Sequence, residues 1–210
     1  MKYAILIGLF ALLVSFTGTP YKKIALQPFD GFDKALLDTV KLTIKDVYGY
    51  QVVVMEDIAL PRQAFINVKF PRYRADSLIR FLRDKDYGSM DYVMGLTPME
   101  LSHTKKDAGG HVKKPAMKYI DWGVHGLGYC PGTSSVASTA KIESDEPSVF
   151  ISRLKKICIH EFGHNLGLPH CPTDKCVMQD SAEKMSTIDD AELRLCNDCK
   201  DKLASIKQSP

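Results

Sequence analysis

Residues 160–171 read His160-Glu161-Phe162-Gly163-His164-Asn165-Leu166-Gly167-Leu168-Pro169-His170-Cys171, and they decide what this 210-residue chain can be. Because residues four apart share one face of an α-helix, His160 and His164 can point at a single metal ion. Gly167 can end that helix, since glycine tolerates the left-handed backbone found after many helices, and the chain can then return His170 to the ion. The stretch predicts an active-site helix with three histidine ligands.

Glu161 would lie beside this ion without binding it. Three neutral histidines leave a zinc ion one open position for water, and zinc lowers the pKa of such water to roughly 7. A neighbouring carboxylate can then take the proton, so we expect Glu161 to be the general base. The short pattern H-E-x-x-H also occurs by chance, but the full pattern, with its glycine and third histidine, resembles that of the metzincin class of zinc hydrolases.

Four cysteines predict a second, closed metal site: Cys171, Cys176, Cys196 and Cys199. Four thiolates bind zinc tetrahedrally and leave no open position, so such a site is structural. A segment of about 40 residues, such as the one that follows His170, rarely buries enough apolar surface to be stable without metal, disulfides or a partner. The alternative is a pair of disulfides, Cys171 to Cys176 and Cys196 to Cys199.

A C-terminal helix is expected to carry two of these cysteines. Ser186 or Thr187 can cap it, and aspartates follow in its first turn. Within that helix, Cys196 and Cys199 would be i, i+3 neighbours on one face.

From His160 to Cys199 the chain reads H-E-x-x-H-x-x-G-x-x-H-C-x4-C-x-M-x17-C-x-x-C. Over these residues the pattern resembles that of the archaemetzincin (archaelysin) family of metallopeptidases. The resemblance extends more loosely to residues 24–29 and 92–97, which fit the opening and central strands of that family.

The resemblance implies that His160, His164 and His170 bind a catalytic zinc, that Glu161 is the general base, and that the four cysteines bind a second zinc. Met178 matches the methionine of the family's Met-turn, an apolar floor under the catalytic metal. Without the resemblance, a methionine is more often ordinary core packing. Two Zn²⁺ ions per chain are therefore the expected cofactors, and a peptide or protein is the expected substrate.

Strands and helices are expected to alternate along the chain. We predict strands at residues 23–29, 51–55, 90–96 and 119–124, and helices at residues 33–48 and 73–83 ahead of the active-site helix. This order predicts a metzincin-like zincin fold of the α/β (α+β) class. It would have a mixed, mainly parallel twisted sheet with an antiparallel edge strand and a small zinc-tied C-terminal helical subdomain.

Residues 122–140 depart from the family pattern, because they are rich in glycine and contain Cys130-Pro131-Gly132. The shape of the cleft therefore does not follow from the resemblance. We expect residues 133–142 to form the edge strand. In metzincins such an edge pairs with the extended backbone of the substrate.

The N-terminus bears on the compartment. Lys2 precedes an apolar stretch at residues 3–16, which is shorter than the roughly 20 residues of a membrane-spanning helix and is typical of a signal peptide. We expect residues 1–20 to be a signal peptide and residues 21–210 a single catalytic domain, in which residues 171–210 hold the structural zinc. Export to the periplasm or the medium follows; a cytoplasmic location is the alternative, since oxidising compartments favour disulfides over zinc thiolates.

Composition suits one enzyme domain. The chain is 45% hydrophobic and 25% charged, and its net charge of +3 is too small to indicate a nucleic-acid partner. Residues 105–115 concentrate lysines between glycines and a proline, which favours a solvated loop over a binding patch, although such a loop can still overhang the cleft. We expect a monomer, with no stable membrane span once the signal is removed.

Five further residues fall outside any ligand spacing: Cys130, Cys158, His103, His111 and His125. We expect buried or free thiols for the two cysteines, with a disulfide between them as the alternative if the protein is exported, and surface or hydrogen-bonding roles for the three histidines.

The sequence favours a zinc metallopeptidase in which Glu161 activates water for peptide hydrolysis. A catalytically silent, zinc-stabilised binding protein on a metzincin frame is the alternative, and hydrolysis of another acyl or amide bond is a third reading. Glu161 counts against the binding protein, because a binding module has no evident need for a carboxylate next to an open zinc.

Overall fold

The computed structural model describes residues 22–180 and 184–208. The signal peptide predicted at residues 1–20 lies outside the described residues. Across the described part of the chain, no helix has the length and apolar character that crossing a membrane requires.

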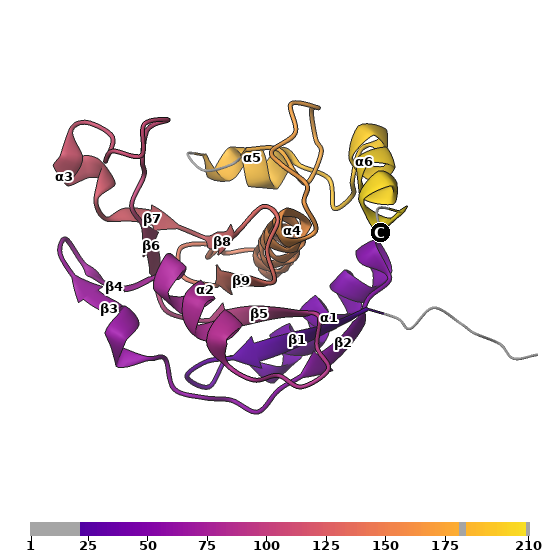
Figure 1. Ribbon diagram of the computed structural model, residues 1–210, viewed down its shortest axis with the longest axis horizontal. Coiled ribbons are helices and arrows are strands. Elements are labelled where there is room, and N and C mark those ends of the chain that lie inside the picture. The colour runs from indigo at the N-terminus through magenta and orange to yellow at the C-terminus, as the bar shows by residue number, and fades with distance from the viewer. Residues whose placement is uncertain (1–21, 181–183, 209–210) are drawn as a thin grey trace, which may run out of the picture.

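A five-stranded sheet forms the centre of the fold, in the order β2-β1-β5-β9-β8 (Figure 1). Four of the strands are parallel, and β8 runs antiparallel to β9. The predicted mainly parallel sheet with an antiparallel edge is confirmed. Its strands are β1 (Lys23–Pro28), β2 (Gln51–Val54), β5 (Tyr92–Thr97), β8 (Gly126–Gly128) and β9 (Ser134–Ser138).

The prediction that residues 133–142 form the edge strand is wrong. Strand β9 lies between β5 and β8, its five residues are all buried, and the three-residue β8 takes the edge of the described sheet. Two of its three serines are hydrogen-bonded inside the protein: Ser134 Oγ donates to the carbonyl of Ile79 and Ser138 Oγ to that of Met99. The buried Ser135 hydroxyl has no partner among the described residues.

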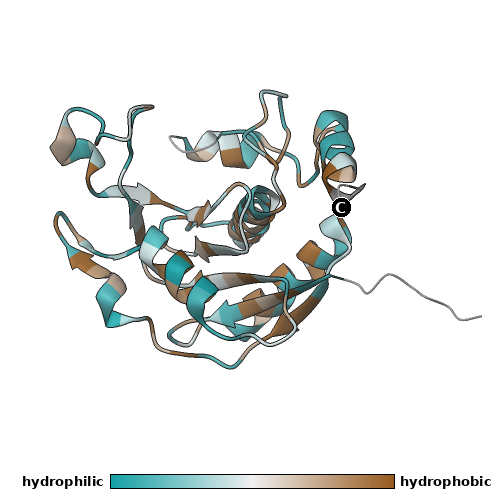
Figure 2. Ribbon diagram, in the orientation of Figure 1, coloured by the Kyte–Doolittle hydropathy of each residue, from teal (hydrophilic) through white to brown (hydrophobic). Residues whose placement is uncertain are grey.

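Helices cover both faces of this sheet. Successive residues of a strand point to opposite faces, so Ile24 and Leu26 pack with α1 (Lys34–Tyr48) and α4 (Pro147–Asn165), whereas Ala25 packs with α2 (Ala75–Asp84). Figure 2 shows apolar residues on the strands between the helices. The sheet is therefore buried on both faces, as parallel sheets usually are.

Local signals explain where α1 begins and ends. The carboxylate of Asp33 accepts a hydrogen bond from the backbone N–H of Leu36, at 2.9 Å, and caps the N-terminus. Gly49 ends the helix in the left-handed conformation, with φ of 75°. The helix predicted at residues 33–48 is confirmed.

A second, four-stranded sheet with the order β3-β4-β6-β7 was not predicted. Its strands are β3 (Phe65–Asn67), which follows the 3-10 turn η1 (Arg62–Ala64), β4 (Pro71–Arg74), β6 (Leu101–His103) and β7 (Trp122–Val124). Strands this short carry little periodic signal. Consequently α2 begins at Ala75 rather than at residue 73, and the strand predicted at residues 119–124 begins at Trp122, because α3 (Ala116–Tyr119) precedes it.

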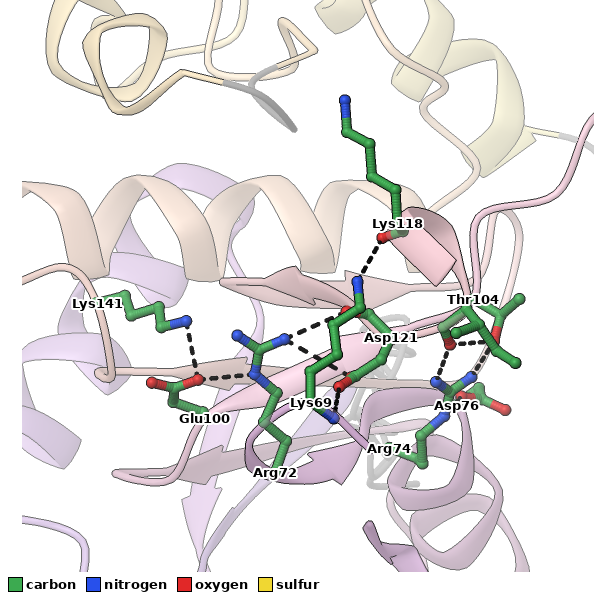
Figure 3. A network of polar contacts seen from close by, with 10 residues as sticks. Lys69, Arg72, Arg74, Asp76, Glu100, Thr104, Lys118, Asp121 and Lys141 are labelled. Atoms are coloured by element: carbon green, nitrogen blue, oxygen red, sulfur yellow. Dashed lines mark hydrogen bonds and ion pairs between the residues drawn. The ribbon is translucent and has the colours of Figure 1, made fainter. Parts of the chain in front are cut away.

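A network of charged groups joins this second sheet to the rest of the fold (Figure 3). The buried Arg72 guanidinium donates to Glu100 at 2.8 Å and lies 3.6 Å from the fully buried carboxylate of Asp121. Glu100 also contacts Lys141, from the loop after β9, at 2.8 Å. The network therefore links β4 to the start of β7 and to the loop that leads into α4.

The C-terminal part contains two helices, α5 (Met185–Asp190) and α6 (Asn197–Gln208), where one was predicted. Ser186 and Thr187 lie inside α5, and Cys196 precedes α6, so the expected single helix is wrong. Helix α4 holds α5 in place: the Lys156 ammonium donates to the carbonyls of Ile188 and Asp189, at 2.9 and 2.8 Å. These donations satisfy carbonyls at the end of α5 that have no partner within that helix.

We expect Arg72→Met to destabilise the protein by about 3 kcal/mol, because Asp121 would be left as a buried charge without its cation. Urea denaturation measures the change. Arg83→Met is the matched control, since Arg83 and Asp84 form an exposed pair on α2, and its denaturation midpoint should match that of the wild type. Equal midpoints for both variants would contradict the role assigned to Arg72.

Candidate functional site

The C-terminal end of α4 places two of the three histidines of the motif. His160 and His164 are one turn apart on the helix and only 8% exposed. The helix ends at Asn165, and Gly167, with φ of 90°, turns the chain back two residues later as expected. The Gly167 N–H donates to the carbonyl of His164, and the Leu168 N–H donates to the carbonyl of Gly163. These carbonyls at the end of the helix are therefore satisfied where the chain turns back.

The three histidines converge in space. Their candidate ligand atoms all lie within 4.8 Å of one another, and the Nε2 atoms of His160 and His164 are 3.0 Å apart. The side chain of His170 closes the group from the solvent side and is 48% exposed. Two Nε2 atoms facing each other at this distance fit ligands that share one ion, since each zinc–nitrogen bond is about 2.0 Å long.

The second ring nitrogens orient these ligands. His160 Nδ1 lies 2.8 Å from the carbonyl oxygen of Val177, and His164 Nδ1 lies 2.7 Å from that of Leu168. Nδ1 therefore donates its proton in both rings, which leaves Nε2 with a lone pair for a metal. Burial also lowers the pKa of His160, to about 3, and that of His164, so both rings are neutral at pH 7, as metal ligation requires.

Glu161 lies on the wall of the same cleft, packed against β8. A Cβ atom on Gly126 would come within 2.6 Å of Glu161 Cγ, and one on Gly128 within 2.4 Å of the Glu161 carbonyl oxygen. Burial raises the pKa of Glu161 to about 8, while a hydrogen bond from the backbone of Gly128 opposes the shift. The glycines of the unusual segment at residues 122–140 thus have a physical reason: a side chain at either position would push β8 away from the motif.

Met178 packs against α4 at Gly163, the residue before His164. It is fully buried, and its carbonyl accepts a hydrogen bond from the N–H of Cys171 at 2.8 Å. A Cβ atom on Gly163 would lie 2.4 Å from Met178 Sδ and 2.7 Å from the hydroxyl of Tyr48. The motif residue between the two helical histidines must therefore be glycine for the methionine to reach the helix backbone.

The four cysteines form a second cluster beside the first. Cys171 Sγ lies 3.7 Å from Cys196 Sγ, and Cys176 Sγ lies 3.8 Å from Cys199 Sγ. Sulfurs at the corners of a tetrahedron around zinc, with bonds of about 2.3 Å, are about 3.8 Å apart. The four residues therefore fit one metal ion. All are free thiols, and the shortest sulfur contacts do not join the pairs of the disulfide alternative.

The electrostatics of the cluster suit thiolates. Burial raises the pKa of Cys196, but hydrogen bonds from the Cys199 backbone and from Thr173 outweigh it and lower that pKa to about 7. The backbone N–H of Cys196 donates to Cys176 Sγ at 3.4 Å. One thiol of the cluster is thus ready to ionise near neutral pH, and a bound cation would favour ionisation of the others.

A cleft of about 430 Å³ opens over the histidines and is lined by β8, the C-terminal half of α4 and α5. It also exposes residues to which the sequence assigned no site. His103 and His125, for which surface or hydrogen-bonding roles were expected, line the cleft, whereas His111 is exposed next to Asp107. Lys105, Lys106 and Lys113 line it as well, although the sequence favoured a solvated loop. The concentration of lysines at residues 105–114 was the available signal.

The two remaining cysteines differ in solvent exposure. Cys158 is fully buried in the core and Cys130 is exposed, and both are free thiols as expected.

Comparison with known proteins gives a consistent result. A sequence model described as Peptidase family M54 matches residues 11–205. The archaemetzincin of Methanopyrus kandleri is 29% identical over 180 residues, which cover 84% of this chain and 93% of that protein. The archaemetzincin of Haloquadratum walsbyi is 29% identical over 165 residues, covering 74% and 84%.

Solved structures agree. The crystal structure of the Methanopyrus kandleri archaemetzincin matches with a TM-score of 0.72 at 28% identity, and the match covers 90% of this chain and 97% of that one. The archaemetzincin of Archaeoglobus fulgidus, crystallised with malonate, shares the fold with a TM-score of 0.67 at 19% identity, covering 86% and 99%.

We expect Gly163→Ala to destabilise the protein by about 1–3 kcal/mol, because the new methyl group would overlap Met178 and Tyr48. Chemical denaturation measures this. Gly123→Ala provides the control, since its methyl group would meet only the Arg72 guanidinium at an ordinary 3.6 Å. A loss of stability no larger in the first variant than in the second would refute the close packing described here.

We also expect Cys196→Ser to lower the melting temperature more than His170→Ala does. The first change opens a buried cluster that joins two segments of the chain, and the second removes a half-exposed ring at the cleft. Thermal melts with and without a chelator compare the two variants. The reverse order would show that the cysteine cluster is not the main structural centre.

Proposed function

Because this chain belongs to peptidase family M54, it is a zinc metallopeptidase, and we propose that Glu161 is the proton-transferring residue of its peptide hydrolysis. His160, His164 and His170 would hold the catalytic zinc. The observation that carries the proposal is the placement of Glu161, buried against β8 and adjacent on α4 to two histidines whose Nε2 atoms face each other.

Zinc bound by the three histidines supplies a Lewis acid that polarises the substrate carbonyl and makes water more acidic. Glu161 transfers the proton: its carboxylate accepts a proton from the attacking water and delivers it to the nitrogen of the departing amine. The Gly128 N–H donates to this carboxylate and so restricts its rotation. The raised pKa of Glu161 makes it a stronger base, and a divalent cation nearby would shift that pKa down again.

Strand β8 would bind the substrate. It is the edge of the described sheet and lines the cleft, so the backbone groups on the side away from β9 can pair with an extended peptide. The absence of side chains at Gly126 and Gly128 keeps this edge close to Glu161. A peptide added to β8 therefore brings its amide bonds to the carboxylate.

The cysteine cluster would hold the second zinc. Four thiolates complete its coordination and leave no place for substrate, so this ion stabilises the fold and takes no part in the reaction. Its ligands come from the loop that follows His170 and from the start of α6, which fits a role in fixing that loop.

We expect Glu161→Gln to keep two zinc ions per chain and to lower peptide cleavage by at least about 100-fold, because the amide cannot accept the proton. Elemental analysis and mass spectrometry of a digested peptide library measure the two quantities on the full chain. Glu146→Gln, an exposed change at the other end of α4, is the matched control and should cleave like the wild type.

Cleavage retained in Glu161→Gln would remove this residue from the mechanism. Two zinc ions with no cleavage by either the wild type or the control would favour the binding-protein alternative.

A further inference from the structure

One end of the catalytic cleft is lined by three lysines, Lys105, Lys106 and Lys113. They belong to the segment between β6 and β7, which we call the lysine hairpin (residues 105–113). In Figure 1 this segment rises on the side of β8 away from α6. None of these lysines takes part in the proposed proton transfer or metal binding, so their position at the cleft asks for another explanation.

The lysine hairpin is an ordered structure and not a loose loop. The N–H of Lys113 donates to the carbonyl of Lys105 at 3.0 Å, and Lys106 and Val112 form an antiparallel bridge. At the tip, the Asp107 carboxylate accepts from the N–H groups of Gly109 and His111, at 2.9 and 3.0 Å. Paired backbones therefore fix the positions along the cleft from which the lysine side chains extend.

The base of the hairpin is fixed to β7. The Lys105 ammonium lies 4.4 Å from the centre of the Trp122 ring, which stacks on Tyr119. The residue before Trp122 is Asp121, which is anchored to Arg72 in the network of Figure 3. The hairpin is therefore connected through Trp122 and the buried Asp121 to β4 of the second sheet.

Among the described residues that line this cleft, lysines outnumber carboxylates, and two of the lysines have no ion-pair partner. Among the described residues, two carboxylates line it: Glu161, which is buried, and Asp180, which lies 3.5 Å from His170 Nδ1. A fourth lysine in the lining, Lys156, donates to two carbonyls of α5. Within residues 22–180 and 184–208, neither Lys106 nor Lys113 forms an ion pair, and both are exposed.

Strand direction says which part of a substrate would reach these cations. β8 runs from Gly126 to Gly128, and β7 and the hairpin lie before its first residue. A peptide that pairs antiparallel with β8, as β9 does on the other side, has its carboxyl-terminal part beyond that first residue. Trp122, at the base of the hairpin, is four positions before Gly126, so at most about 13 Å of extended chain separates them. An extended substrate covers this distance with about four residues.

We propose that the lysine hairpin selects peptide substrates that carry carboxylate groups within four residues on the carboxyl-terminal side of the cleaved bond. The inference rests on the proposed function, because it assumes a peptide bound along β8. Lys106 and Lys113 would pair with these carboxylates, which come either from aspartate and glutamate side chains or from the end of the peptide chain itself.

The test uses the full, zinc-loaded chain and sets of matched peptides. One set places glutamate or glutamine at each of the four positions after the cleaved bond, and a second set without acidic side chains ends in a free carboxylate or an amide at those positions. We expect kcat/KM to favour the carboxylate peptides about fivefold or more, and the preference to fall as salt screens the charges. The two sets distinguish side-chain from terminal carboxylates.

The double variant Lys106→Gln/Lys113→Gln should bring the ratio of kcat/KM for glutamate and glutamine peptides close to one. Lys114→Gln is the matched control: it is an exposed lysine in the same segment that does not line the cleft, and it should keep the wild-type ratio. Equal ratios in the double variant, the control and the wild type would overturn the proposal, as would a wild type with no preference in either set.

A binding measurement separates this inference from the proposed function. Fluorescence anisotropy of the same peptides, labelled and mixed with Glu161→Gln, should show tighter binding of carboxylate peptides even where no bond is cut. Preferential binding without any cleavage by the wild type would support the lysine hairpin and contradict the peptidase mechanism. Cleavage by the wild type, with equal binding and equal kcat/KM for the carboxylate and uncharged peptides, would support the peptidase mechanism and contradict the role of the lysine hairpin.

Discussion

The close packing of the last two turns of α4 is the constraint on which the rest of the structure depends. This helix carries two candidate metal-binding rings and a carboxylate, all largely buried, and burial of such groups is costly unless their surroundings are arranged for them. Behind the helix, Phe162 meets the edges of Tyr48, Tyr50 and Tyr92, at ring distances between 5.1 and 5.4 Å. On the other sides the backbone of β8 and Met178 approach within contact, which only glycines allow.

The histidine cluster and the cysteine cluster share one piece of chain, so neither is independent of the other. His170 is followed directly by Cys171, and Cys176 by Val177, whose carbonyl orients His160. The Cys171 N–H bonds to the carbonyl of Met178, which closes the loop between them. An ion held by the four thiolates would therefore fix the segment that positions one catalytic ligand, orients a second and places the apolar floor. This explains in physical terms why a closed site lies beside an open one.

The walls of the cleft are built from elements that are short and rely on their neighbours. Helix α5 has six residues and is held against α4 by two contacts. Lys156 of α4 donates to carbonyls of α5, and Arg153 of α4 forms an ion pair with Asp189 of α5. The opposite wall is a hairpin attached to three-residue strands, which the Arg72 network joins to the main sheet.

The sequence by itself determined the features that depend on neighbours along the chain. A helical period puts His160 and His164 on one face, Gly167 ends the helix, and the cysteine spacings and the strand–helix alternation predict a second metal site and a mainly parallel sheet. Only the tertiary structure decided which strand forms the edge, how the second sheet is built and that the lysine hairpin reaches the cleft. Three-residue strands have no period to detect, and a serine-rich strand is indistinguishable from a surface strand until its hydrogen-bond partners, distant in sequence, are known.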